Sequence, residues 1–312
     1  MKLSSVQAFV LVAEQGSIRA AARQLGLSQP ALSKNLRVLE EELAAPLLTR
    51  SALGVVPTAY GKAFLLRARL IVSELRKSAE DVAQLRGELE GKLTISVSPA
   101  STSRLAPAAI SAFRSECPNV DLHILEGVFP HVGELIRNGL VDIAVGPLLI
   151  EPPKSAFSVE RLLDIDMVIT ARRGHPLGGA RSLAELGGAD WLHLGVGDLP
   201  NLLVVRTFRT HQLPAPRLKV ECRSLTTSIM LLQSSDLLCL LPRPIVENST
   251  MHDSLAIIDV REPIAPNTLG LIRRADTPLT RVGQIFATHV RRTAAYLSSH
   301  KLAGPGARST RL

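Results

Sequence analysis

The chain has 312 residues, enough for two or three domains, and its 46% hydrophobic and 21% charged residues are typical of a globular protein rather than a disordered one. A formal net charge of +8 favours an anionic partner, and nucleic acid, a membrane surface and small anions are all compatible with it. Polar residues interrupt the N-terminal segment where a signal peptide would be apolar, and no run of about 18 apolar residues predicts a membrane span. We therefore expect a cytoplasmic protein.

Two short helices are predicted at the start of the chain. Apolar residues recur at helical spacing after the capping candidates Ser4 and Ser5, and Gly16 ends this first helix. Ser17 can cap the second helix, which runs from Ile18 to Leu25 and is rich in alanine. Because small side chains permit close approach between helices, we expect the two helices to pack tightly.

A third helix follows a tight turn at Gly26-Leu27. Ser28 is a good N-cap, and Pro30 is acceptable in the first turn, where its missing N–H costs nothing. The helix runs to Leu43, with leucines at spacings of three and four on one face. Three short helices with a tight turn before the third predict a helix-turn-helix, which places its third helix in the major groove of DNA.

The opposite face of this third helix carries groups suited to DNA. Gln29 and Ser33 are predicted to contact base edges, and Lys34 and Arg37 to contact phosphates or guanine. Ser28 and Pro30 belong to the same predicted interface. For this helix alone, an amphipathic helix with a solvated polar face is the alternative. The preceding alanine-rich helix and tight turn favour DNA binding.

A β-hairpin is predicted next. Two short apolar segments between Pro46 and Thr58 flank a turn at Leu53-Gly54. We expect this hairpin to act as a wing, whose Arg50 contacts the phosphate backbone or the minor groove. Thr58 is also included among the residues predicted to lie at the DNA interface.

One long helix is predicted from Thr58, its candidate N-cap, to Leu89. Alternating spacings of four and three join Phe64, Ala68, Ile71, Leu75, Ser78, Val82, Leu85 and Leu89. A period of 3.5 held over this length favours pairing with another helix, and packing against the chain's own domains is the alternative. Pairing would make the binding head dimeric, so that two heads bind two half-sites on DNA.

A specific combination of motifs lies in this N-terminal segment. The pattern A-A-x-x-L-x-x-S-Q-P-A-x-S spans residues 21–33, and L-x-R and P-T-x-x-G follow at 48–50 and 57–61. The combination resembles the N-terminal head of LysR-type transcriptional regulators. Leu48 stands where that family usually shows phenylalanine, and it keeps the packing role. Residues 68–99, from ARLIVSELRK to SVSP, resemble the branch that regulates toluenesulfonate and galactose-binding-protein genes.

The resemblance implies a homotetramer, arranged as a dimer of dimers, that binds and bends double-stranded promoter DNA. Members of the family commonly activate a divergent target gene and repress their own. RNA polymerase is a further candidate partner, and no membrane partner is expected.

The chain is expected to divide into a winged helix-turn-helix at 1–58, a linker and dimerisation helix at 59–90, an effector-binding domain at 91–300 and a mobile tail at 301–312. Within the effector-binding domain, lobe I is expected at 91–161 and 268–300, and lobe II at 162–267.

Strand and helix patterns alternate through the C-terminal two thirds of the chain. Strands are predicted near 93–97, 122–125, 141–145, 167–171, 191–194, 218–222, 237–241 and 269–273, and helices near 105–113, 135–136, 199–211, 226–234 and 279–297. This alternation argues for an α/β region with a largely parallel sheet. The expected fold class is α+β and multi-domain, with a winged helix-turn-helix, a long linker helix and a two-lobed α/β domain. The resemblance implies that this domain is built like a periplasmic binding protein.

Two lobes joined by crossing strands would leave a cleft, and two strand-to-helix turns near it are rich in hydroxyl groups. One turn holds Ser98, Ser101, Thr102 and Ser103, and the other holds Ser224, Thr226, Thr227 and Ser228. Helix N-termini present N–H groups and a partial positive charge, so these turns suit a small carboxylate, sulfonate or phosphate effector. N-capping is the alternative role of these hydroxyls. The other candidate lining residues are Ala100, Phe129, Leu148, Val196, Pro200 and Asn201.

Sequence patterns of enzymes and metal sites are absent. The sequence has no G-x-S-x-G, no strand followed by G-x-G-x-x-G and no phosphate-binding G-x-x-x-x-G-K, and no pair of its eight histidines has metal-ligand spacing. His123 and His193 lie in apolar strands and are interpreted as core or cleft-wall residues, and Asp164 and Asp166 as solvated. We therefore expect neither catalytic residues nor a metal or cofactor.

The three cysteines lie far apart in the sequence. Cys117, Cys222 and Cys239 form neither a C-x-x-C pair nor a zinc spacing. They are interpreted as buried thiols of a reducing compartment, with a redox role as the alternative.

The predicted function is that of an effector-responsive transcription regulator. A cytoplasmic solute-binding or sensor protein, whose N-terminal helices are only a docking module, is the alternative, and the lack of a signal peptide argues against exported solute binding. An enzyme with an accessory DNA-binding head is a third hypothesis, which no catalytic constellation supports.

Overall fold

The computed structural model describes residues 1–51, 54–148, 152–195, 202–247 and 253–301. The chain divides into two compact units, Met1–Glu88 with Arg137–Leu140, and Leu89–Ile136 with Val141–Leu312. Each unit has a buried core of its own. None of the described helices is long and apolar enough to cross a membrane.

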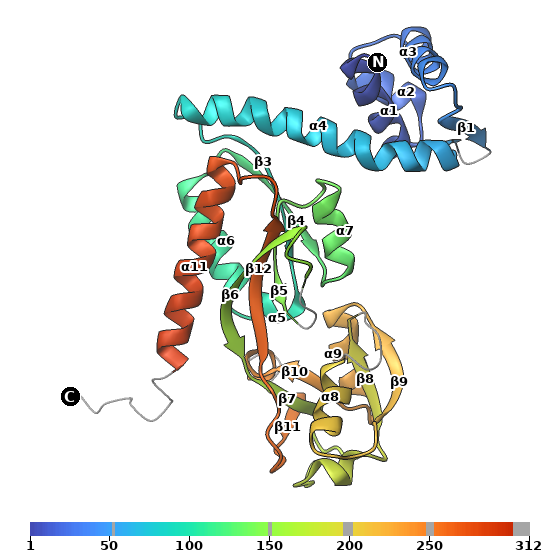
Figure 1. Ribbon diagram of the computed structural model, residues 1–312. Helices are drawn as coiled ribbons and strands as arrows, with labels where there is room; N and C mark the ends of the chain where they lie inside the picture. Colours follow the sequence, from blue (N-terminus) through green and yellow to red (C-terminus); the bar gives the residue numbers. More distant parts are fainter. Residues whose placement is uncertain (52–53, 149–151, 196–201, 248–252, 302–312) are drawn as a thin grey trace. The chain divides into compact units, whose positions relative to one another are not determined.

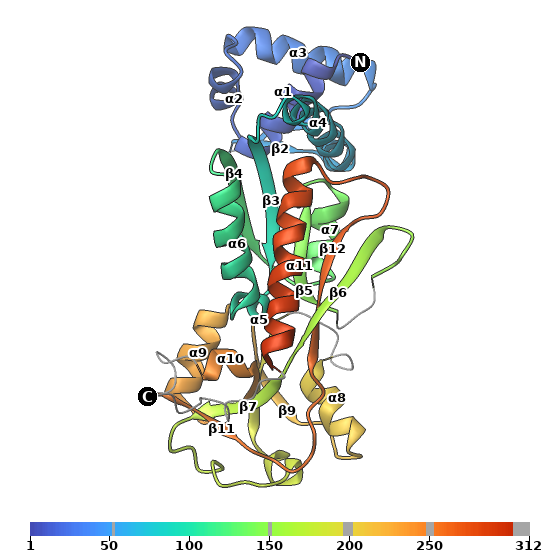
Figure 2. The ribbon, with the colours of Figure 1, turned by 90° about the vertical axis from the view of Figure 1, so that its left-hand side faces the viewer.

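The first unit combines helices with a two-stranded hairpin (Figures 1 and 2). Its elements are α1 Leu3–Gln15, α2 Ile18–Gln24, α3 Gln29–Glu42, β1 Leu48–Ser51, β2 Gly54–Pro57 and α4 Ala59–Leu85. The predicted helices, the hairpin and their order are confirmed. The predicted caps of the first helix are wrong, because Lys2 is the N-cap and its carbonyl accepts the N–H groups of Ser5 and Val6 at 3.1 and 3.3 Å. Ser4 and Ser5 therefore lie inside α1.

Local signals set the ends of the first two helices. Gly16 adopts the left-handed conformation, with φ of 64°, and ends α1 as predicted. The hydroxyl of Ser17 accepts the N–H of Ala20 at 3.2 Å and caps α2, also as predicted. Gly26, with φ of 65°, then turns the chain toward α3.

The core of this unit lies between the helices. Leu43 of the predicted apolar face is 37% exposed because α3 ends at Glu42. The rings of Phe9 and Phe64 meet with centroids 5.3 Å apart and join α1 to the first turns of α4. The buried leucines of α3 are Leu32, Leu36 and Leu39, as their spacing predicted.

Helix α4 is shorter than predicted, and its apolar seam divides into two parts. The helix ends at Leu85 rather than at Leu89, and Gly87 follows with φ of 93°. Phe64 and Ala68 pack against the core of the head, in line with the alternative of packing within the chain. The rest of the seam, here called the α4 seam, is exposed: Ile71 to 43%, Leu75 to 42%, Val82 to 53% and Leu85 to 84%.

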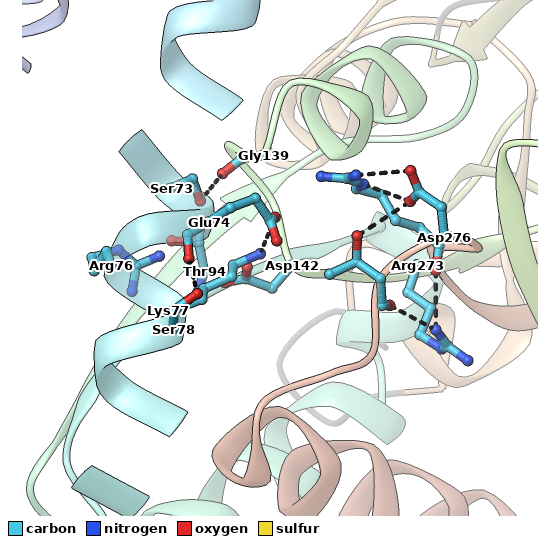
Figure 3. A network of polar contacts seen from close by, with 12 residues as sticks. Ser73, Glu74, Arg76, Lys77, Ser78, Thr94, Gly139, Asp142, Arg273 and Asp276 are labelled. Atoms are coloured by element: carbon cyan, nitrogen blue, oxygen red, sulfur yellow. Dashed lines mark hydrogen bonds and ion pairs between the residues drawn. The ribbon is translucent and has the colours of Figure 1, made fainter. Parts of the chain in front are cut away.

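A five-stranded mixed sheet forms one half of the second unit, in the order β4-β3-β5-β12-β6. Its strands are β3 Gly91–Val97, β4 Val120–Glu126, β5 Ile143–Pro147, β6 Phe157–Ile165 and β12 Asn267–Arg274. Strand β3 pairs in parallel with β4 and β5, whereas β12 pairs antiparallel with β5 and β6. Asp142 precedes β5, and its carboxylate accepts the N–H of Thr94 at 2.8 Å, which holds β5 in place beside β3 (Figure 3).

Helices cover both faces of this sheet. On one face, α6 Leu105–Glu116 and α11 Arg281–Lys301 lie side by side (Figure 2), and the rings of Phe113 and Phe286 meet edge to face at 5.5 Å. On the other face, α7 His131–Arg137 buries Ile136 in a smaller apolar cluster. The short helix α5 Pro99–Thr102 follows the end of β3.

The other half of this unit contains two smaller sheets, β10-β7-β11 and β8-β9. Its elements are β7 Met167–Arg172, the 3-10 helix Leu183–Leu186, β8 Asp190–Leu194, α8 Leu203–Thr210, β9 Arg217–Cys222, α9 Leu225–Ser234, β10 Cys239–Pro242, α10 Arg243–Val246 and β11 Leu255–Ile258. Trp191 anchors the core here: its ring meets Phe208 edge to face at 5.6 Å, and its Nε1–H donates to the carbonyl of Leu186 at 3.2 Å. Strand β6 leads directly into β7, and the chain returns from β11 to β12 (Figure 1).

The expectation of a largely parallel sheet is wrong. Among the described strands, β3 pairs in parallel with β4 and β5, and β8 pairs in parallel with β9, whereas β12 and the β10-β7-β11 sheet are antiparallel. Alternating strand and helix patterns do not show the direction in which β12 returns to the first sheet. Strands β6 and β11 were not predicted. Of the tail predicted at 301–312, Lys301 is the last residue of α11, and residues 302–312 lie outside the described residues.

The three cysteine thiols differ in burial, and we therefore expect them to differ in reactivity toward alkylating reagents. Cys117 and Cys239 are buried and Cys222 is half-buried, and all three are free. Burial raises the pKa of the Cys239 thiol to about 12, so at pH 8 only about one thiol in 10,000 would be a thiolate. Iodoacetamide at pH 8 is therefore expected to alkylate Cys222 well before Cys239, as read by peptide mass spectrometry. In urea all three should react alike, and rapid alkylation of Cys239 in the folded chain would contradict this burial.

Candidate nucleic-acid interface and effector site

The recognition helix α3 presents its predicted DNA-binding face to solvent. Gln29, Lys34 and Arg37 are exposed, and Ser33 is half-buried. The hydroxyl of Ser28 accepts the N–H of Ala31 at 3.3 Å and caps the helix, with Pro30 in the first turn. Because these features are local, the sequence prediction of this helix start is confirmed.

Arg37 is held in place while it stays on the surface. Its Nε–H donates to Oε1 of Glu41 at 2.7 Å, and this hydrogen bond raises the pKa of Arg37 above its ordinary value. The guanidinium therefore stays charged. Since both side chains are mostly exposed, water screens the pair, and a phosphate can replace Glu41 at small cost.

The wing lies beside this face. Strands β1 and β2 pair antiparallel, with Arg50 opposite Val55, and the side chain of Arg50 lies outside the described part of the structure. The hydroxyl of Thr58 caps α4 as predicted: it accepts the N–H of Gly61 at 3.0 Å and donates to the carbonyl of Pro46 at 2.6 Å. Thr58 therefore has a structural role, and its predicted contact with DNA stays a prediction.

A groove of about 140 Å³ separates α3 from the wing. Arg37 and Ser33 line it on the helix side, and Thr49 and Val55 line it on the wing side. Glu40 also lines this groove, and its carboxylate accepts two backbone N–H groups of the wing. Glu40 is not among the residues predicted from the sequence to lie at this interface, although an acidic residue next to the apolar face of a helix is a recognisable signal.

The first hydroxyl-rich turn of the effector domain is a well-formed helix cap. Ser98 and Ser101 are fully buried and form a capping box at α5, each hydroxyl accepting the other residue's backbone N–H. The hydroxyl of Ser101 also donates to the carbonyl of Val145 at 3.0 Å, and that of Thr102 donates to the carbonyl of Pro99 at 2.7 Å. The capping alternative thus accounts for these hydroxyls, and their contact with an effector stays a prediction.

The second turn is open to solvent. Ser224 caps α9 by accepting the N–H of Thr227 at 3.3 Å, and Ser224, Thr226 and Thr227 are exposed, whereas Ser228 is buried. These side chains are accessible to a ligand, unlike Ser98 and Ser101 in the first turn.

The other candidate lining residues have packing roles or fall outside the described residues. Ala100 is buried in α5. Phe129 meets Phe157 edge to face at 5.6 Å, and Leu148 packs over Gly270. Val196, Pro200 and Asn201 lie outside the described residues.

The two histidines and two aspartates interpreted from the sequence differ in their exposure to solvent. His123 is exposed on β4, the edge strand of its sheet, so its interpretation as a core residue is wrong, and the alternative of a cleft-wall residue stays a prediction. His193 is half-buried, and burial lowers its pKa, which favours the neutral ring. Asp164 and Asp166 are exposed, as expected for solvated residues.

Comparison with known protein families covers both units. Residues 3–62 match the family described as bacterial regulatory helix-turn-helix protein, lysR family. Residues 86–295 match the LysR substrate binding domain. The chain is a LysR-type transcriptional regulator. The head is therefore a DNA-binding domain, and the C-terminal region is an effector-binding domain.

Relatives and solved structures of LysR-type regulators resemble this chain over most of its length. The HTH-type transcriptional regulator GbpR of Azospirillum brasilense is 28% identical over 90% of this chain and 83% of its own length. GalR of Pseudomonas putida is 31% identical over 86% of this chain and 68% of its own length. The fold resembles CbnR, a LysR family transcriptional regulator, alone (TM-score 0.71) and in complex with its target DNA (TM-score 0.69), at 21% identity over 94% of this chain and 99% or 100% of CbnR.

Proposed function

We propose that this LysR-type regulator binds its operator as a dimer of dimers and that a small anionic organic molecule controls it. The observation that carries the dimer is the exposed α4 seam, and the pairing of two dimers rests on the resemblance to the LysR family. Ile71, Leu75, Val82 and Leu85 repeat at spacings of four, seven and three, and each is at least 42% exposed. An apolar seam of this length is expected to pair with its copy in another chain.

At the DNA, the proposed interface divides contacts between the helix and the wing. Gln29 and Ser33 would face base edges in the major groove, and Lys34 and Arg37 would face phosphates or guanine. Arg50 of the wing would contact the backbone or minor groove. Ser28, Pro30 and Thr58 would support the interface from the two helix starts. Exposure of Gln29, Lys34 and Arg37 supports this assignment.

For the effector, the second hydroxyl-rich turn supports an anion more directly than the first. Helix α9 has ten residues, and Ser224 and Thr226 lie exposed at its N-terminus, where helix N–H groups favour negative charge. The proposed site also includes Ser98, Thr102 and the other lining residues named from the sequence. A net charge of +8 is compatible with an anionic ligand.

The proposed role is regulatory rather than catalytic, and the proposed location is the cytoplasm. We propose RNA polymerase as a further partner at the promoter. The proposed domains are a head at 1–58, a linker helix at 59–90 and an effector domain at 91–300, with lobe boundaries near 161 and 268.

A nuclease footprint on the intergenic DNA beside the protein's own gene tests the proposal. The footprint is taken alone and with carboxylates, sulfonates and phosphate esters, and uncharged alcohols of the same carbon skeletons serve as controls. We expect two protected half-sites with a hypersensitive bend, and an anion that shortens the protection or removes the bend. Protection that no anion alters would overturn the effector proposal, and protection of a single half-site would overturn the dimer.

A further inference from the structure

Glu40 joins the recognition helix to the wing. Its Oε1 accepts the backbone N–H of Leu47 at 2.7 Å and that of Leu48 at 3.0 Å. Leu48 is the first residue of β1, and Glu40 is half-buried on α3, seven residues after Ser33. Seven residues are nearly two helical turns, so Glu40 lies on almost the same face of α3 as Ser33.

The wing needs such connections because it is small. Strands β1 and β2 have four residues each, and an isolated two-stranded hairpin is marginally stable in water. A backbone hydrogen bond from Val55 N–H to the Gly16 carbonyl, at 2.9 Å, also connects the wing to the end of α1, whereas the bond from Thr58 N–H to the Leu47 carbonyl, also at 2.9 Å, closes the hairpin itself. Hydrogen bonds to a carboxylate are roughly twice as strong as neutral ones, so Glu40 makes the strongest of these contacts.

The charge of Glu40 is unfavourable for DNA binding by itself. The carboxylate lines the groove between α3 and the wing, in a head that binds a polyanion. Repulsion between this carboxylate and phosphates would weaken binding unless the residue contributes something else. Holding two amides of the wing is the contribution that the contacts provide.

We propose that Glu40 is a positioning residue, which sets the wing relative to the recognition helix so that α3 and Arg50 contact the same duplex. The carboxylate itself does not contact DNA. This inference rests on the proposed contact between Arg50 and a phosphate.

A double-mutant cycle in the full-length protein tests the proposal. The probe is a fluorescein-labelled duplex of mixed sequence, and its affinity is measured by anisotropy over a range of KCl concentrations. Arg50→Ala should reduce the salt slope by about one per bound head, the value for one lost phosphate contact. In the Glu40→Ala background the same substitution should change the slope by less than half as much, because Arg50 is no longer held at the backbone.

Two further variants separate positioning from charge and from folding. Glu40→Gln keeps an acceptor oxygen and should restore part of the Arg50 effect. Glu42→Gln removes the same charge from the same helix without touching the wing, and should leave the Arg50 effect intact. Thermal denaturation checks that each variant is folded, and if Glu40→Ala is not, the Glu40→Gln background decides.

The outcomes distinguish this inference from the proposed interface. If Arg50→Ala leaves the DNA affinity and its salt slope unchanged in the otherwise native protein, the proposed contact between Arg50 and DNA is wrong, and the positioning role of Glu40 is overturned as well. If Arg50→Ala has its full effect in all backgrounds, the wing contact stands and the positioning role of Glu40 is overturned.

Discussion

Replacing Leu75 and Val82 of α4 together by glutamate is expected to abolish pairing through α4, so that the protein sediments as a smaller species than the native oligomer, and to weaken its binding to operator DNA by about a hundredfold or more. The two side chains are 42% and 53% exposed and lie seven residues apart on the α4 seam. Pairing of two α4 helices would bury both side chains. The glutamates introduced on the two helices would then lie in an interface without water, where their negative charges would repel each other. Each head would then bind a half-site alone, without the gain that comes from linking two heads.

The measurement combines analytical ultracentrifugation with anisotropy on the footprinted operator. Leu66→Glu is the matched control: Leu66 is 47% exposed and lies nine residues from Leu75, on the opposite side of α4. We expect the control to assemble and to bind the operator like the native protein. A double variant that still sediments as the native oligomer would show that the α4 seam is not the pairing surface.

Replacing Gly61 by alanine is expected to destabilise the head by about 3 kcal/mol, the upper end for overpacking in a core. A Cβ at this position would lie 1.9 Å from the carbonyl oxygen of Leu47 and 2.9 Å from its carbon. Both are backbone atoms, and the same oxygen accepts the N–H of Thr58 at 2.9 Å, so no side-chain rotation relieves the clash. The start of α4 must move away from the wing, and DNA affinity should fall with it.

Urea unfolding followed by circular dichroism measures this loss, because the head is mostly helical. The single tryptophan, Trp191, lies in the other unit, so hydrogen exchange of the α1 and α4 peptides is needed to assign the loss to the head. Gly188→Ala is the control, since a Cβ there meets nothing within 4 Å. A loss below about 1 kcal/mol for Gly61→Ala would mean that the close approach of α4 to the wing is not a tight constraint.

The head could be predicted in detail because its signals are local. Gly16, Ser17, Ser28 and Thr58 each act on backbone groups within about four residues, and the structure places all four as predicted. The start of α1 is the exception. There the carbonyl of Lys2 receives the first N–H groups, and the two serines taken as caps lie within the helix.

The effector domain could be predicted as strands and helices but not as a sheet. The direction of β12 depends on how the chain returns from β11, and its partners β5 and β6 lie more than a hundred residues earlier. The capping box at Ser98 shows the same limit. The sequence pattern predicts a hydroxyl-rich turn there, but it does not predict the hydrogen bond from Ser101 to the carbonyl of Val145, 44 residues away.

The sequence by itself determined the LysR-type head, the polar face of its recognition helix and the apolar seam of α4, because each depends on residues spaced a few positions apart. Only the tertiary structure decided which part of that seam is covered by the head, that Glu40 holds the wing, and that Gly61 admits no side chain. These features depend on backbone groups that a turn brings together. The spacing of the residues on either side of a turn does not predict the direction in which the turn leads the chain. The same physical reason makes Glu40 and Gly61 the positions where single substitutions test the fold most directly.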